Sequence, residues 1–166
     1  MITIPDGITF EIKDDKITVK GPKGNVTKKF PKTLKVEKNG NSLNIISLSK
    51  KDDALVGTYD SILKSMIEGV TNGYTKKLKA IYAHFPISFE VKGSNIIIKN
   101  FLGEKNPRLS KIVGDGTKVE VKGTQLTISG PDKEAIGQTI ANLKAALKIR
   151  EKDPRVFQDG VYEVVE

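Results

Sequence analysis

The feature of this sequence that most limits its possible folds is a six-residue pattern that occurs twice. ITFEIK at residues 8–13 returns as ISFEVK at residues 87–92. The match runs without a gap over residues 8–24 and 87–103. It then shifts by four residues and resumes, with LKVEKNGNSLNI at 34–45 over TKVEVKGTQLTI at 117–128. A repeated order of elements over this length predicts two copies of one folding unit.

Each copy contains short runs in which apolar and polar residues alternate. In the first copy the predicted strands are residues 8–13, 16–20, 34–38 and 42–48, and similar runs follow in the second. Alternation with a period of two is typical of antiparallel strands that have one face on a core and the other in water. Turn-forming pairs such as Gly93-Ser94 and Gly123-Thr124 separate the runs and predict tight hairpins.

After each predicted sheet the apolar spacing lengthens to three and four residues, which predicts one helix per copy. The first helix is expected at roughly residues 50–70 with Gly73 ending it, and Pro131 is expected in the first turn of the second helix. We assign both apolar stripes to core packing rather than to a cofactor pocket. The stripes consist of Leu55, Val56, Tyr59, Ile62, Leu63, Met66, Ile67 and Val70, and of Ile136, Ile140, Leu143 and Leu147.

These signals together predict an α+β fold class with two tandem duplicated domains, each a small antiparallel sheet covered by one helix. We place the N-terminal repeat at residues 1–75 and the C-terminal repeat at residues 76–166. Residues 150–166 have no counterpart in the first copy and no helical or strand stripe. This tail is compatible with an extended arm lying on a partner, and equally with a strand or loop that folds back on its own domain.

The composition favours a cytoplasmic protein with an acidic partner. The chain has no cysteine, its apolar content is 37%, and no run reaches the ~20 apolar residues that cross a bilayer. MITIPDGITF lacks the basic start and apolar stretch of a secretory signal. Lysine plus arginine number 28 against 20 carboxylates, a formal charge of +8, and nucleic acid is the commonest partner of such a chain. The alternative is that the charge serves solubility alone.

The sequence contains no combination of residues that would support catalysis. His84 is the single histidine, there is no cysteine to join it in a triad, and a partly buried structural role is the favoured interpretation. GPKGNVTK at 21–28 and GDGTK at 114–118 lack the spacing of a phosphate-binding loop and are interpreted as turns. We therefore predict that the protein is not an enzyme and has no cofactor, no metal and no small-molecule substrate.

All three arginines lie in the second copy. Arg108 is in the loop FLGEKNPRLSK, and Arg150 and Arg155 are in KIREKDPRVF after the second predicted helix. Arginine is better suited than lysine to bidentate phosphate contacts and to stacking on bases. The asymmetry points to these two segments as nucleic-acid contacts, with chance placement as the alternative.

Together with the duplication, three motifs carry a resemblance to a known family. They are AHFPI at 83–87, NFLGEK at 100–105 and DPRVFQDGVY at 153–162. On these motifs the chain resembles the universal large-subunit ribosomal protein six family, of the archaeal and eukaryotic type, over essentially its whole length. The resemblance implies a structural constituent of the large ribosomal subunit. It also implies binding of large-subunit rRNA near the translation-factor site, by the sarcin-ricin loop, with neighbouring ribosomal proteins at the base of the lateral stalk as further partners.

The same resemblance implies that the second domain and its tail hold the rRNA. Carried over to this sequence, the expected rRNA-binding residues are Lys105, Arg108, Arg150, Lys152, Arg155 and Phe157, with Tyr82 and His84 as further contacts. The expected mechanism is phosphate neutralisation and recognition of shape, with little readout of bases. The alternative function is a protein-docking module with a basic surface; in neither case is a membrane a partner.

Overall fold

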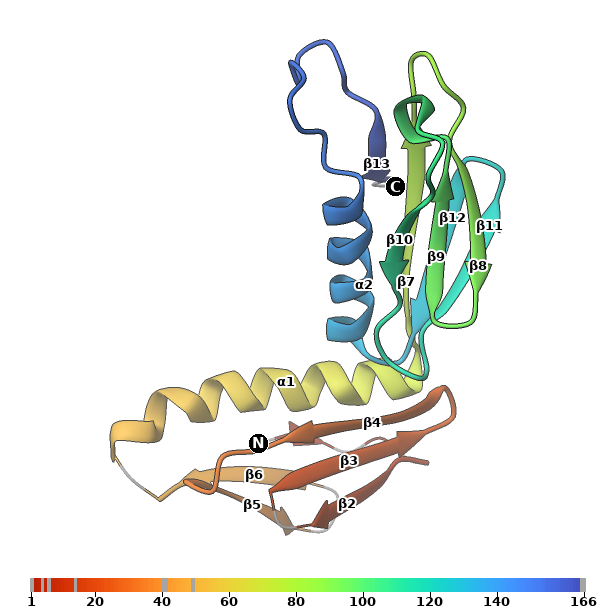
Figure 1. Cartoon of the computed structure of the whole chain (residues 1–166). Helices are drawn as coiled ribbons and strands as arrows, with labels where there is room; N and C mark the ends of the chain where they lie inside the picture. The colour runs from red at the N-terminus through yellow and green to blue at the C-terminus, as the bar shows by residue number, and fades with distance from the viewer. Residues whose placement is uncertain are drawn as a thin grey trace. The chain divides into compact units, whose positions relative to one another are not determined.

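The structure is a computed structural model, shown in Figure 1, and it describes residues 2–3, 5, 7–13, 15–39, 42–48 and 50–164. The chain divides into two compact units. The N-terminal unit comprises Met1–Gly73 with Pro131–Lys133, and the C-terminal unit comprises Tyr74–Gly130 with Glu134–Glu166. None of the helices in these described ranges has the length and apolar character needed to cross a membrane.

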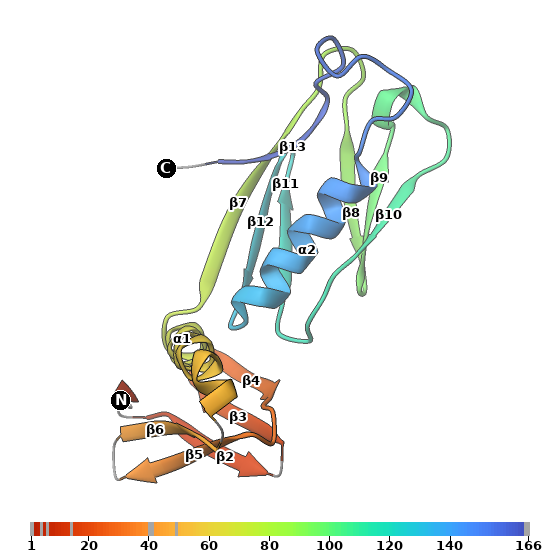
Figure 2. The same cartoon turned by 90° about the vertical axis from the view of Figure 1, so that its left-hand side faces the viewer.

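The N-terminal unit contains two three-stranded antiparallel sheets and one helix. One sheet has the order β2-β3-β4 and the other the order β1-β6-β5. Helix α1 lies over the strands, and Figure 2 shows it nearly end-on. The bounds are β1 Ile2–Thr3, β2 Thr9–Lys13, β3 Lys16–Gly21, β4 Gly24–Lys29, β5 Leu34–Asn39, β6 Ser42–Ser47, the short 3-10 helix η1 Lys50–Asp52, and α1 Asp53–Thr71.

The C-terminal unit repeats this plan with one addition. Its sheets have the orders β10-β9-β8 and β11-β12-β7-β13, and all neighbouring strands are antiparallel. The added strand is β13, from the tail. The bounds are β7 Tyr74–Ile81, β8 Ser88–Lys92, β9 Asn95–Lys99, the short 3-10 helix η2 Phe101–Gly103, β10 Arg108–Lys111, β11 Lys118–Lys122, β12 Gln125–Gly130, α2 Lys133–Ala146 and β13 Gly160–Glu163.

Each unit has its own apolar core, built from the predicted helix stripe and the inward face of the strands. The α+β class with duplicated order is therefore confirmed, although each copy has two small sheets where a single sheet was expected. The N-terminal core contains Ile17, Val19, Val26, Phe30, Leu43, Leu63, Met66, Ile67 and Val70. The C-terminal core contains Leu78, Ala80, Ile87, Ile96, Ile98, Phe101, Leu126, Ile128, Ile136, Ile140, Leu143, Leu147 and Val161.

The predicted helix ends are partly right. Gly73 follows α1 in the left-handed region, with φ +77°, and its N–H donates to the Gly69 carbonyl at 3.0 Å, as expected of a helix-ending glycine. The expected position of Pro131 is wrong, because α2 begins at Lys133 and the proline precedes it. Pro131 therefore lies in the connection that leads to α2.

Strands β1, β4 and β10 were not predicted from the sequence, and β13 was one of two alternatives left open for the tail. GPKGNVTK, interpreted as a turn, contains a turn at Pro22-Lys23 that leads into β4. Strand β10 lies within the expected loop FLGEKNPRLSK, and β13 lies in the tail. Strands β4, β10 and β13 are short or rich in polar residues, and each is stabilised by pairing with a neighbouring strand rather than by its own apolar pattern.

Candidate nucleic-acid interface

Three loops gather at one end of the C-terminal unit: 82–87, 100–107 and 148–159 (Figures 1 and 2). The first two are joined by a hydrogen bond from the Asn100 side-chain amide to the Pro86 carbonyl, at 3.1 Å. Gly103, with φ +76°, comes so close to the Phe85 ring that a Cβ atom there would lie 3.2 Å from it. Because the loops support one another, this end of the unit is a defined surface, which we call the loop end.

The eight residues that the resemblance singles out all lie in or next to these three loops. Most have exposed side chains, whereas Arg108 and Phe157 are half-buried. The expectation of a partly buried His84 is wrong. The imidazole is exposed, because the buried residues of this connection are Ala80 and Ile87 on either side of the loop. The exposed members are Tyr82, His84, Lys105, Arg150, Lys152 and Arg155.

Arg108 uses its guanidinium within the protein. Its Nε donates to Glu104 Oε2 at 2.8 Å and its Nη2 donates to the second carboxylate oxygen of the same residue. Its Nη1 donates to the carbonyls of Ala146, at 2.8 Å, and Lys148, at 3.3 Å, where α2 ends. The guanidinium carbon also lies 4.6 Å from the centre of the Phe101 ring. Arg108 therefore joins the 100–107 loop to the start of the 148–159 loop.

This pairing also fixes the ionisation state of Glu104. The hydrogen bonds from Arg108 hold the pKa of the Glu104 carboxyl below its usual range, against a weaker opposing effect of burial. A charged, bidentate carboxylate is the partner that a planar guanidinium binds best. The helix C-terminus adds the negative end of the α2 dipole close to the same cation. The charge of Arg108 is thus largely compensated internally.

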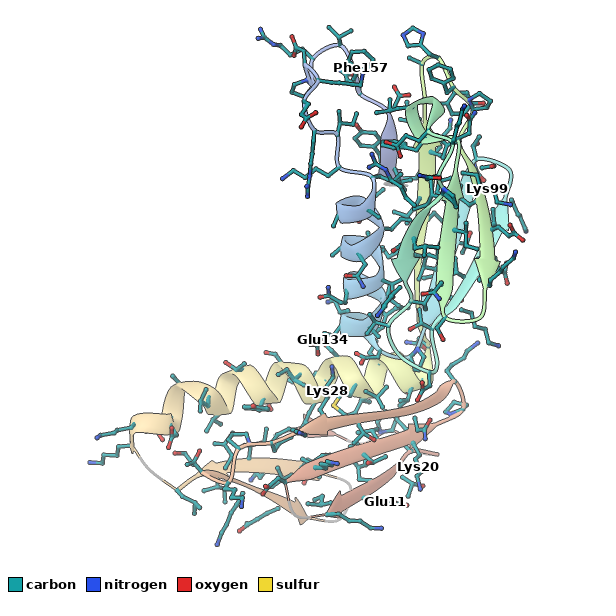
Figure 3. All side chains as sticks on the ribbon, in the orientation of Figure 1. Glu11, Lys20, Lys28, Lys99, Glu134 and Phe157 are labelled. Atoms are coloured by element: carbon teal, nitrogen blue, oxygen red, sulfur yellow. The ribbon has the colours of Figure 1, made fainter. Side chains whose placement is uncertain are left out.

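The 148–159 loop presents its cations outward. Arg155 has a side chain that is 91% exposed, its Nε lies 3.4 Å from Asp153 Oδ1, and its backbone N–H donates to that same oxygen at 2.9 Å. The Lys152 ammonium lies 4.7 Å from the centre of the Phe157 ring, which Figure 3 labels at this end of the unit. An aromatic ring beside exposed cations is a suitable platform for an unpaired base and its phosphates.

After this loop the chain folds back on its own domain, which decides between the two alternatives for residues 160–163. Strand β13 pairs with β7, with Val161 opposite Ala80, and Val161 is buried. The Tyr162 hydroxyl donates to the Gln158 carbonyl at 2.8 Å. Glu163 binds Lys144 of α2 at 2.7 Å. Residues 148–163 therefore form a closed loop anchored at both ends rather than a free arm.

The ion pairs of Glu163 make this anchor depend on pH. A hydrogen bond and the charge of Lys144, followed by the more distant Lys76, lower the pKa of Glu163 from its ordinary value of about 4.5. When folding lowers the pKa of a carboxyl group, the ionised group stabilises the folded state at pH values above its ordinary pKa. That stability is lost as the pH falls through the lowered pKa.

We expect Glu163→Gln to speed hydrogen exchange of the Tyr162 amide severalfold at neutral pH, because the ion pairs that hold β13 are lost. After correction for intrinsic exchange, the wild-type protein should approach the rate of the variant only when the pH falls through the lowered pKa of Glu163. Equal exchange rates of the two proteins at neutral pH would contradict this expectation.

A cleft of about 520 Å³ opens between the end of α2, the 100–107 loop and the start of the tail. A few apolar side chains line it together with several cations and two carboxylates. The cleft is therefore polar and open to solvent rather than a closed ligand pocket. No group of histidine, cysteine or carboxylate side chains suited to a metal ion occurs in the described part of the chain. The lining residues are Leu102, Glu104, Arg108, Ala145, Ala146, Lys148, Arg150, Glu151 and Lys152.

Comparison with known proteins decides the family. A family model described as Ribosomal protein L6 matches residues 4–73 and 85–160, one segment in each unit. The chain belongs to the ribosomal protein L6 family. Proteins of the L6 family are structural ribosomal proteins, which agrees with the prediction that this chain is not an enzyme.

Archaeal relatives match almost the whole chain, and each is named large ribosomal subunit protein uL6. The protein of Methanosarcina mazei is 44% identical over 166 residues, covering 98% of this chain and 94% of the relative. That of Methanobrevibacter smithii is 45% identical, covering 97% and 92%. That of Staphylothermus marinus is 45% identical, covering 97% and 90%. The resemblance to the archaeal branch of the L6 family is thus confirmed.

Sequence reasoning missed several residues that shape the loop end. Glu104 was passed over, although its spacing of four residues from Arg108 could have suggested the pair. Phe101 was not distinguished from the rest of its motif, although it is buried beneath the Arg108 guanidinium. Asp159 is buried, and its Oδ2 accepts no hydrogen bond from the described residues. Nothing in the sequence separates this carboxylate from a surface one.

Proposed function

We propose that this protein is a structural constituent of the large ribosomal subunit and that its loop end binds large-subunit rRNA. Membership of the L6 family and the names of its archaeal relatives support the assignment to the subunit. The observation that carries the proposed site is the gathering, at one end of one unit, of exposed cations from the 100–107 and 148–159 loops beside the exposed rings of the 82–87 loop. A cytoplasmic location follows from assembly into ribosomes.

The residues of the loop end divide into two roles. Lys105, Arg150 and Arg155 are exposed and able to approach phosphates. Within the described residues, the side chains of Lys105 and Arg150 have no ion-pair partner. Arg108 instead acts mainly as a positioning residue, because its donors hold Glu104 and the end of α2. The eight residues that the resemblance suggests thus act together, although not all by direct contact.

The mechanism is neutralisation of phosphates by a surface of fixed shape. Each cation that replaces condensed counterions on RNA gains the entropy of their release, which makes affinity depend strongly on salt. Phe157, Tyr82 and His84 add rings on which unpaired bases or sugars can lie. Readout of base edges is minor, because the exposed donors are long, flexible cationic chains rather than buried amides.

Within the subunit, we place the loop end near the translation-factor site, by the sarcin-ricin loop, with ribosomal proteins at the base of the lateral stalk as neighbours. This placement is supported by the resemblance carried by AHFPI, NFLGEK and DPRVFQDGVY, which contribute the three loops. The C-terminal repeat, residues 76–166, supplies the contact with its tail.

The site is tested with the double variant Arg150→Gln/Arg155→Gln and an rRNA fragment from the factor-site region. Losing two phosphate contacts should weaken binding roughly tenfold and lower the slope of log affinity against log salt by about 1.5. The slope is measured by filter binding between about 50 and 200 mM salt. The matched control, Lys118→Gln/Lys122→Gln, removes the same charge from the edge strand β11 and should change the slope little.

Equal losses in the two double variants would show that net charge alone drives binding, and would reject the loop end as the site. An equal affinity for an unrelated RNA of the same length, with a shallow salt slope, would favour the protein-docking module instead. Retention of the loop variant on large subunits after a high-salt wash, at the level of the wild-type protein, would also contradict the proposal.

A further inference from the structure

The outer face of the β2-β3-β4 sheet is entirely polar. The inward residues of these strands, such as Ile17, Val19 and Val26, are buried in the N-terminal core beneath α1. The residues between them point the other way, and Figure 3 shows Glu11 and Lys20 on this side, away from the helix. The outer face consists of Thr9, Glu11 and Lys13 on β2, Lys16, Thr18 and Lys20 on β3, and Asn25, Thr27 and Lys29 on β4.

One cross-strand row of this face is made only of lysines. Lys13 is opposite Lys16, and Lys16 is opposite Lys29, so three exposed cations lie on adjacent strands. Neighbouring strands are about 4.8 Å apart, and like charges directly opposite one another destabilise a sheet. The one carboxylate of the face, Glu11, is hydrogen-bonded to Lys20 in another row. The folded chain therefore keeps an arrangement that costs stability.

The duplication shows that the fold does not require this arrangement. In the second copy the same sheet, β8-β9-β10, has the corresponding row Lys92, Asn95 and Lys111, so an asparagine replaces the central lysine. The next row also differs. Thr18 and Thr27, whose hydroxyl oxygens are 3.0 Å apart, correspond to the apolar pair Ile97 and Leu109. The two outer faces have the same strand pairing but carry different side chains.

From these observations we infer that the outer face of β2-β3-β4 is a second nucleic-acid surface, which binds the phosphate backbone of an RNA duplex. Three ammonium groups in a line match a run of phosphates, and the neighbouring threonine hydroxyls can donate to phosphate oxygens or 2′-hydroxyls. The face carries no aromatic side chain, so it lacks the stacking platform that unpaired bases need. This surface does not depend on the loop end of the C-terminal unit.

The test uses the full chain and an RNA duplex of about 16 base pairs, long enough to present two successive minor grooves. The triple variant Lys13→Gln/Lys16→Asn/Lys29→Gln should bind at least tenfold more weakly at ~100 mM salt, with a salt slope lower by about 2.7. It should unfold at the same temperature as the wild type or higher, because repulsion between the lysines is removed. The matched control, Lys50→Gln/Lys51→Gln/Lys64→Gln, should retain the wild-type slope.

Three outcomes are decisive. A triple variant that is folded and binds the duplex with unchanged affinity and slope overturns the proposal. If it loses binding to a polyglutamate peptide but not to the duplex, the face belongs to an acidic protein, and the proposal also fails. If the triple variant is poorly folded, Lys16→Asn alone, which restores the residue of the second copy, should still lower the slope by nearly 1. Repeating the titrations with Arg150→Gln/Arg155→Gln separates failure of this surface from failure of the loop end.

Discussion

Replacing Arg108 by alanine is expected to lower the free energy of unfolding of the C-terminal unit by about 2–3 kcal/mol. The substitution removes a bidentate pair with Glu104 and leaves the Ala146 and Lys148 carbonyls without this donor. It also removes the cation above the Phe101 ring, a contact that contributes about 0.5–1 kcal/mol at exposed sites. The loss should appear in native-state hydrogen exchange of α2 and β12, which reports on this unit alone.

Arg108→Lys provides the control for charge. It keeps the cation but cannot form the planar fork, so it should recover less than half of the lost stability. Glu104→Gln keeps the shape of the side chain and should be intermediate. If Arg108→Ala and Arg108→Lys both had the free energy of unfolding of the wild type, the guanidinium contacts would not hold the two loops together. The positioning role of Arg108 would then be wrong.

Arg108→Ala should also weaken rRNA binding, but in a different way from Arg150→Gln/Arg155→Gln. Loosening the 100–107 loop lowers the population of the correctly shaped surface, which reduces affinity across all salt concentrations. Losing a direct phosphate contact instead lowers the salt slope by nearly 1 per contact. The slope therefore separates positioning from contact for each residue that the family resemblance suggests.

Most of the fold follows from the sequence because the chain repeats itself. The duplicated pattern ITFEIK and ISFEVK is reproduced as β2 and β8. The second predicted helix stripe is buried in its core, and the first is buried from Leu63 onward, whereas Leu55 and Val56 are half-buried outside the core. The short strands β4, β10 and β13 could not be predicted. GNVTKK, RLSK and GVYE carry little alternation of their own, and their strand state depends on the partners beside them.

The site was predictable in composition but not in geometry. The motifs identify the family and place the eight candidate residues in or next to three loops, but they cannot show that these loops meet at one end of one unit. Nor could the sequence separate Arg108 from Arg155, which appear equivalent in a loop and a tail. Arg108 is held by Glu104 and by the end of α2, because it lies beside helix carbonyls that lack hydrogen-bond donors. The Arg155 side chain is 91% exposed.

The largest loss of stability is expected from Phe101→Ala, at about 3–5 kcal/mol. Phe101 is 1% exposed and inserts its ring from the 100–107 loop into the C-terminal core. The residues on either side of it, Asn100 with φ +60° and Leu102 with φ +52°, lie in the left-handed region, which non-glycine residues adopt at a cost. The buried ring between two strained positions holds the loop in this conformation. Removing the ring leaves a cavity and allows the strained backbone at Asn100 and Leu102 to relax.

Phe157→Ala is the matched control, because it removes the same ring from the same end of the unit but from a half-buried position. It should cost less than about 1 kcal/mol of stability while weakening rRNA binding through the lost stacking surface.

The double variant Phe101→Ala/Arg108→Ala should lose about 0.5–1 kcal/mol less free energy of unfolding than the sum of the losses of the two single variants, because the two side chains contact each other. Strict additivity in hydrogen exchange of α2 would show that the ring and the guanidinium act independently, and the loop would then need another anchor.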